Sequence, residues 1–363
     1  MDRLAAAIAG KEGNPSLVGL DPRPALLPDQ LIRQAVETTR AKSGIPDLTP
    51  AGVDDLEPDD RRRLDESWAY ELAQAYVRFN LSVLDAVADL VPAVKPQIAM
   101  YEALGAPGIE AYLSTCRAAR ERGLYVIGDV KRGDIGSTAS AYACHLSGLP
   151  LTWGQACLQV EAGTDPAHRE APAPSPWQED AITVNPYLGS DGIEPFVQAA
   201  QAHDKDIFVL VRTSNPSSSQ IQELPLADGQ EGRNLCQRVG ELVEEWGASS
   251  VGSCGYSRIG AVVGATQPQV GALLRQAMPH TFFLLPGYGA QGGTAKDAAA
   301  MFGPDGSGAI VNSSRGIIGA WKRSGSWSPS LSLEVALGLV SSEARKAAVT
   351  MKTELTQAVK ETK

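Results

Sequence analysis

Residues 124–143 read LYVIGDVKRGDIGSTASAYA, an apolar run that ends in charged residues and passes through a loop into a helical pattern. Asp129 and Lys131 stand at the end of the run, and Asp134 lies in the loop beyond it. Residues two apart on a strand point to the same face, so both charged side chains can project from the strand end. Active sites of α/β barrels are built from such carboxyl ends of strands. The segment therefore predicts a strand over 124–131 with chemistry at its end.

Seven similar runs lie on either side of this segment, and helical patterns separate them. Their continuous apolar character is typical of strands covered on both faces, and the helices supply the crossovers that parallel strands require. Eight such units predict a single (β/α)8 barrel, also called a TIM barrel, because that fold repeats a strand and a helix eight times. The seven runs are SLVGLD (16–21), AVKPQIA (93–99), AITVN (181–185), DIFVLVRT (206–213), IGAVVGA (259–265), TFFLLP (281–286) and GAIVNSS (308–314).

The chain of 363 residues fits one large barrel domain with additions, since such barrels run from roughly 200 to over 400 residues. Two polar stretches interrupt the βα rhythm and predict surface insertions at about 40–65 and 147–179. The second contains APAPSPW and has the composition of a loop excursion, not of a second domain. Helical periodicity over 333–363 predicts a C-terminal helical extension from about 330 that packs outside the barrel.

Composition limits the function classes. With 43% hydrophobic and 20% charged residues the chain can bury a large core. A net charge of -10 argues against a nucleic-acid partner, so an anionic ligand must be held by local groups. The five cysteines form no CxxC pair, which indicates neither a zinc cluster nor a disulfide framework and favours a reduced, cytoplasmic setting. No stretch reaches the ~20 apolar residues of a membrane span, so no membrane association is expected.

The Asp-x-Lys-x-x-Asp pattern of Asp129, Lys131 and Asp134 restricts the chemistry further. A lysine between carboxylates stays protonated, so Lys131 is expected to donate a proton and not to form a Schiff base. The Asp129 carboxylate, placed beside a carboxylate of the substrate, would raise the energy of the bound substrate by repulsion. The Lys131 ammonium would stabilise the carbanion that remains when CO2 leaves, and would then protonate it. Taken alone, the pattern fits an exposed turn with paired surface charges equally well.

Two motifs carry a family resemblance over most of residues 16–318. GDVKRGDIGSTA and VKPQIAMYE resemble the signatures of orotidine 5′-monophosphate decarboxylases, in a bacterial subgroup of that family. The resemblance implies that Asp129 and Lys131 flank the scissile carboxylate and that Lys131 protonates C6 of the pyrimidine. It also implies that Asp134, Ile135 and Thr138 reach into the site of a neighbouring subunit, so that a homodimer shares its active sites. No metal and no organic cofactor are implied.

Residues on three other strands complete the implied site. By resemblance Asp21 binds the ribose hydroxyls, and Lys95 completes an alternating Lys-Asp-Lys-Asp array. Lys95 stands in an apolar strand, where a buried lysine needs a carboxylate partner. By resemblance Ser214, just after the fifth strand, binds the polar edge of the pyrimidine, and a hydroxyl suits this role because it both donates and accepts.

The phosphate site is expected after the last two strands, in LLPGYGAQGGT and VNSSRGI. Barrels commonly bind phosphate there through backbone amides and a helix N-terminus. The Arg315 guanidinium can bind phosphate oxygens in a bidentate way, and Gln291 touches the phosphate by resemblance. Glycines let the backbone come close to a ligand; those assigned to this site are Gly287, Gly289, Gly292, Gly293 and Gly316.

Other functions fit parts of the sequence. Gly287-x-Gly289-x-x-Gly292 also matches a dinucleotide fingerprint, but no further βαβ run and ribose-binding acid follow it. A related barrel could use the same Asp-x-Lys-x-x-Asp frame with magnesium on sugar phosphates, and metal dependence would distinguish it. A catalytically silent nucleotide-binding barrel is a third alternative. A fusion with the preceding phosphoribosyltransferase is disfavoured, because no acidic pair with a Gly/Thr-rich phosphate loop is present.

Overall fold

The computed structural model describes residues 1–45, 48–162, 175–227 and 233–362. Its centre is a closed barrel of eight parallel strands in chain order, with β8 pairing back onto β1. All eight predicted strands are present, and the predicted (β/α)8 barrel is confirmed. The closed barrel excludes the Rossmann interpretation of the glycine-rich segment, which needs an open sheet. The strands are β1 Ser16–Leu20, β2 Ala93–Pro96, β3 Tyr125–Arg132, β4 Ala181–Val184, β5 Asp206–Arg212, β6 Ile259–Val263, β7 Phe283–Leu285 and β8 Ala309–Ser313.

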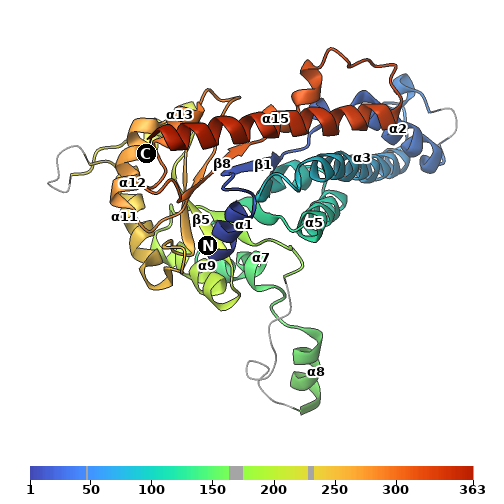
Figure 1. The fold of residues 1–363 in the computed structure, drawn as a ribbon. Coiled ribbons are helices and arrows are strands. Elements are labelled where there is room, and N and C mark those ends of the chain that lie inside the picture. Colours follow the sequence, from blue (N-terminus) through green and yellow to red (C-terminus); the bar gives the residue numbers. More distant parts are fainter. Residues whose placement is uncertain (46–47, 163–174, 228–232, 363) are drawn as a thin grey trace.

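Helices surround the barrel and connect its strands (Figure 1). Each strand is followed by at least one helix before the next strand begins, as parallel pairing requires. The helices are α1 Asp2–Gly10, α2 Asp29–Ser43, α3 Pro58–Val87, α4 Ile98–Glu102, α5 Ala106–Glu121, α6 Gly136–Tyr142, α7 Cys144–Ser147, α8 Trp153–Ala162, α9 Ser190–Ala202, α10 Ser219–Gln222, α11 Leu235–Gly247, α12 Pro268–Ala277, α13 Ala295–Ala299, α14 Arg315–Ile318 and α15 Leu333–Thr362.

The apolar strand residues are buried on both faces of the barrel wall. One hydrophobic cluster fills the space between the barrel and its helices, and Phe79, Phe196 and Trp321 are among its large members. A second cluster lies inside the barrel and includes Leu4 of α1 together with Leu17 and Phe208 of the strands. Burial on both sides explains why these strands have continuous apolar runs and no polar alternation.

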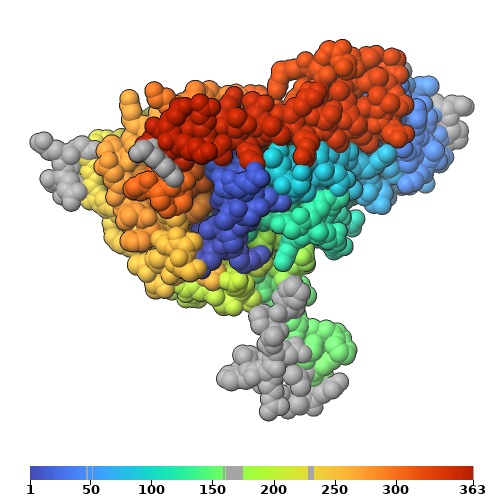
Figure 2. Space-filling model, in the orientation of Figure 1, coloured from blue at the N-terminus to red at the C-terminus, as the bar shows by residue number. Residues whose placement is uncertain are grey.

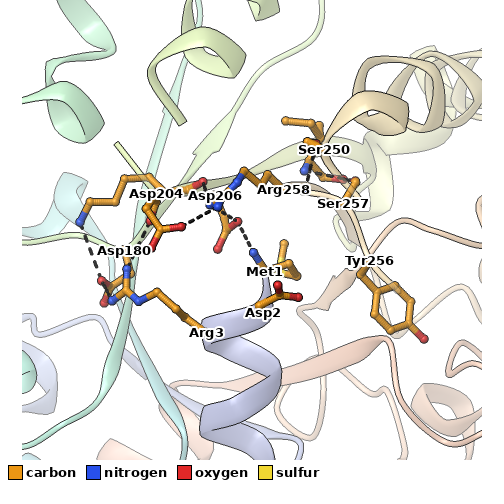
Figure 3. A network of polar contacts seen from close by, with 12 residues as sticks. Met1, Asp2, Arg3, Asp180, Asp204, Asp206, Ser250, Tyr256, Ser257 and Arg258 are labelled. Atoms are coloured by element: carbon orange, nitrogen blue, oxygen red, sulfur yellow. Dashed lines mark hydrogen bonds and ion pairs between the residues drawn. The ribbon is translucent and has the colours of Figure 1, made fainter. Parts of the chain in front are cut away.

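A polar network fixes α1 under the amino ends of the strands (Figure 3). The Met1 amine pairs with Asp206 at the start of β5, and Arg3 pairs with Asp180 just before β4. Arg258 approaches Asp206 from the segment before β6, with 3.8 Å between Nη1 and Oδ1. The carboxylates are almost fully buried and each has a cationic partner, which buried charges require. This end of the barrel is therefore closed, and a ligand must enter from the opposite end.

The helical pattern over 333–363 corresponds to α15, which lies across α3 and α13 on the outside of the barrel (Figure 1). Within the first predicted insertion, about 40–65, α2 continues to Ser43 and α3 starts at Pro58. The second, about 147–179, contains α8, which stands away from the body of the molecule (Figure 2). Residues 163–174 of that insertion lie outside the described residues. In the described part of the chain, no helix has the length and apolarity needed to cross a membrane.

Candidate active site

A cavity of about 730 Å³ opens at the carboxyl ends of the strands. This is the end of the barrel at which barrel enzymes hold their active sites. The cavity brings together residues from sequence segments that are far apart, and most of the predicted site residues line it. Those residues are Asp21, Lys95, Asp129, Lys131, Ser214, Gly287, Gln291 and Arg315.

A buried carboxylate between two lysines forms the floor of the cavity. Lys95 contacts Oδ2 of Asp129, and Lys131 contacts its Oδ1. The side chains of Lys95 and Asp129 are 4% and 9% exposed, whereas that of Lys131 is 45% exposed. Lys95 therefore has the carboxylate partner that its burial demands, and Lys131 remains open to the cavity.

The electrostatics of this cluster favour the charged forms of Asp129 and Lys95. Burial would raise the pKa of Asp129, but the charges of Lys95 and then Lys131 outweigh it and hold that pKa below its ordinary value. Burial would lower the pKa of Lys95, yet Asp129 and Asp21 raise it above the ordinary value of a lysine. The cluster thus presents an ionised carboxylate that contacts both lysines.

The backbone that carries Lys131 differs from the regular strand expected from sequence. Lys131 has φ +45°, in the left-handed region that non-glycine residues rarely adopt. The pairing of β3 with β4 is irregular between Gly128 and Arg132. Asp129 and Lys131 do meet in the cavity, but a bulge places them there and not the ordinary alternation of a strand.

Two buried oxygens at the cavity wall accept no hydrogen bond from the described residues. They are Oδ1 of Asp21 and Oδ1 of Asn312. Asn312 lies on β8 and was not singled out from sequence, although an amide in an otherwise apolar strand was a signal for it. A buried acceptor without a partner is costly, so both oxygens are suited to receive hydroxyl donors from a ligand.

Two further polar residues of the floor were missed. The Gln97 amide donates to Oδ2 of Asp129 at 2.9 Å, and the Thr183 hydroxyl donates to Oδ1 at 3.1 Å. In the sequence, Gln97 follows Lys95 and Pro96, and Thr183 lies within the apolar run AITV. The family resemblance assigned no role to either residue. With the two lysines, they give the Asp129 carboxylate four donors and a fixed orientation.

The opposite wall carries the residues expected to bind phosphate. Gly287 has φ +100° and Gly292 φ +98°, conformations that glycine adopts without strain. Arg315 donates to the carbonyl of Ala290 at 2.9 Å, which ties its guanidinium to this loop. Ser214 Oγ donates to Gln291 Oε1 at 2.8 Å across the cavity mouth. Gly289 and Gly316 line an adjoining cavity of about 290 Å³, while Gly292 and Gly293 are not among the residues lining the main one.

Asp134, Ile135 and Thr138 do not join the cavity of their own chain. The Asp134 carboxylate accepts the N–H of Ile135 at 2.8 Å, and Ile135 is 53% exposed. Nearby, Tyr142 on α6 and the loop residues Tyr187 and Leu188 are also exposed. Asp134 therefore lies outside the cavity of its own chain, in a segment that carries exposed apolar side chains.

A closed parallel barrel with a charged cavity at the carboxyl ends of its strands is the architecture of an α/β-barrel enzyme. The Lys-Asp-Lys floor, with Arg315 on the opposite wall, suits an anionic ligand. The model of the "Orotidine 5'-phosphate decarboxylase / HUMPS family" matches residues 74–153 and 170–327. A relative from Rhodopirellula baltica, named orotidine 5'-phosphate decarboxylase, is 41% identical over 321 residues, or 88% of each chain. The chain belongs to this family.

Two further comparisons agree. A Clostridium novyi protein of the same name is 41% identical over 252 residues, covering 69% of this chain and 77% of its own. The solved structure of Leishmania donovani OMP decarboxylase superposes with a TM-score of 0.61 at 26% identity, covering 99% of this chain and 98% of that one. The family resemblance found in the sequence is therefore confirmed.

Proposed function

We propose that the chain decarboxylates orotidine 5′-monophosphate to uridine 5′-monophosphate and CO2, the final step in making the pyrimidine nucleotide. The observation that carries the proposal is the buried Asp129 carboxylate between Lys95 and Lys131, in one cavity with Arg315 at the start of α14. The family membership and the relatives' names support the same reaction.

The chemistry follows from charges on the floor. The C6–carboxylate bond breaks heterolytically, CO2 leaves, and the electron pair stays on C6. The ionised Asp129 stands near the substrate carboxylate and raises the energy of the bound ground state, a strain that falls as CO2 departs. The exposed ammonium of Lys131 stabilises the negative charge at C6 and then gives it a proton. Lys131 regains a proton from solvent.

The remaining groups bind the nucleotide. The unpaired oxygens of Asp21 and Asn312 accept hydrogen bonds from the ribose hydroxyls. The Ser214 hydroxyl forms hydrogen bonds with the polar edge of the pyrimidine. The Arg315 guanidinium, Gln291 and the amides of the Gly287 loop hold the phosphate. Phosphate binding far from C6 contributes by positioning the pyrimidine over the lysine.

We further propose a homodimer in which Asp134, Ile135 and Thr138 complete the partner's active site. The exposed side chains of Ile135, Tyr142 and Tyr187 support it, because exposed large apolar side chains near an active site are suited to an interface. The position of Asp134 outside its own cavity supports it as well. Each site would then hold the full Lys-Asp-Lys-Asp array.

The proposal includes one barrel domain over 1–363, with the two insertions and the C-terminal extension as parts of it, in a reducing, cytoplasmic setting. The contacts of α15 with α3 and α13 support a single unit. The free thiols Cys116, Cys144, Cys157, Cys236 and Cys254 are compatible with a reducing compartment.

The competing function is a magnesium-dependent reaction on a sugar phosphate in the same frame. Both oxygens of Asp129 already contact ammonium groups, which leaves that carboxylate poorly suited to bind a cation as well. The test is the loss of orotidylate ultraviolet absorbance with and without a chelator. We expect equal turnover in both. No turnover of orotidylate, or turnover abolished by the chelator and restored by magnesium, would reject the proposal.

Replacing Arg315 by alanine tests the phosphate assignment. We expect kcat/KM for orotidylate to fall by about 10²–10³, because a charge-assisted bidentate contact is lost where it holds the substrate in place. Turnover of orotidine, which lacks the phosphate, should be unchanged by the substitution. Arg345→Ala is the matched control, since this arginine pairs with Asp89 on the outside of the barrel. Equal losses with both substrates would contradict the assignment.

A further inference from the structure

Thr183 on β4 stands opposite the bulge that carries the lysine and the carboxylate. Gly128 pairs with Ile182, and Arg132 pairs with Val184. Three residues of β3, 129–131, therefore face the single residue Thr183. A bulge of this kind leaves a backbone group without its ladder partner and re-aims the side chains that it carries.

The Thr183 hydroxyl fills the gap. The Lys131 N–H donates to Thr183 Oγ1 at 2.9 Å, and the same hydroxyl donates to Asp129 Oδ1 at 3.1 Å. Because the oxygen accepts from the amide, its single proton is directed to the carboxylate. Thr183 is 2% exposed, so water does not compete for either bond. One hydroxyl thus joins the main chain of the proton donor to the carboxylate beside it.

The conformation of Lys131 needs such a support. A lysine in the left-handed region persists only where its surroundings hold it there. The left-handed conformation falls on Lys131 and not on the nearby Gly133, which could adopt it without strain. The side chain of Lys131 is partly exposed, and its direction depends on this backbone.

We propose that Thr183 is a positioning residue for decarboxylation, which holds the left-handed Lys131 backbone and the Asp129 carboxylate in the arrangement that reacts. The inference rests on the proposed function and adds to it a residue that acts through Lys131 and Asp129. A displacement of about 1 Å at a reacting group costs on the order of 10²-fold in rate.

The test compares Thr183→Val, which keeps the shape and removes the hydroxyl, with Thr183→Ser, which keeps the hydroxyl. We expect kcat to fall by about 10–10² in the valine variant, with KM and the affinity for uridine 5′-monophosphate within about threefold of wild type. The serine variant should return kcat to within about threefold of wild type. Thr281→Val is the matched control, because this buried hydroxyl contacts Glu244 at the other end of the barrel; its kcat should not change.

Hydrogen exchange at the Lys131 amide gives a reading that does not depend on turnover. The amide should exchange faster in Thr183→Val than in wild type and Thr183→Ser. A valine variant with wild-type kcat, a serine variant as slow as the valine variant, or nucleotide affinity falling in parallel with kcat would each overturn the inference. If the wild-type protein does not turn over orotidylate, the proposed function fails, and amide exchange still decides whether Thr183 holds the Lys131 backbone.

Discussion

Lys131→Ala is expected to lower kcat for orotidylate by at least about 10⁴. Lys131 is the only one of the two floor lysines whose side chain is substantially exposed to the cavity. Its removal takes away both the proton for C6 and the positive charge that stabilises the electron pair there. General acid catalysis contributes about 10²–10⁴, and electrostatic stabilisation of the developing charge adds to it. The measurement is the decrease in orotidylate absorbance at equal concentrations of folded protein.

Two controls separate lost chemistry from lost structure. Lys346→Ala removes an ammonium that is 69% exposed on α15, and its kcat should match wild type. The Lys131→Ala protein should still bind uridine 5′-monophosphate, because Asp21, Ser214 and Arg315 are intact. In deuterated water, the wild-type protein should place deuterium at C6 of the product. A Lys131→Ala variant with near wild-type turnover would contradict the proposed role.

The barrel could be predicted from the sequence because its strands are buried on both faces. TFFLLP and IGAVVGA, for example, have no polar alternation. Such runs, separated by helical patterns, are compatible with only a few folds. The same regularity places Asp129 and Lys131 at a strand end and therefore at the cavity. Long-range partners are different: nothing local in the sequence connects Arg3 to Asp180, because their pairing depends on how α1 seats under the barrel.

The backbone conformation of Lys131 and the polar contacts of the cavity floor could not be predicted from local sequence patterns. An Asp-Val-Lys run is compatible with an ordinary strand, and no glycine marks the left-handed position at Lys131. Thr183 and Asn312 carried a weaker signal that could have been used, since each is a polar residue inside an apolar strand. The importance of Thr183 follows only from the pairing register, which places it opposite the bulge. That of Asn312 follows from its buried oxygen, which has no donor among the described residues.

Mixing two inactive variants is expected to restore activity if the sites are shared between subunits. Lys131→Ala and Asp134→Ala should each be nearly inactive as homodimers. In a two-fold dimer formed from one chain of each, one site combines both defects and the other combines intact Lys131 with the partner's intact Asp134. Random exchange makes about half of the dimers mixed, so about one quarter of all sites become wild type. Activity should therefore rise from below about 10⁻³ to about one quarter of the wild-type value.

A second mixture controls for effects of mixing itself. Lys95 and Lys131 line the cavity of the same chain, so a dimer of Lys95→Ala with Lys131→Ala contains no intact site and should stay inactive. Purification through two different tags isolates the mixed dimers, and their turnover is then measured directly. In isolated mixed dimers of Lys131→Ala with Asp134→Ala, half of the sites should be active. Mixed dimers that remain inactive would show that Asp134 serves its own chain, which would require the loop after β3 to turn inward from the exposed position it occupies beside Ile135.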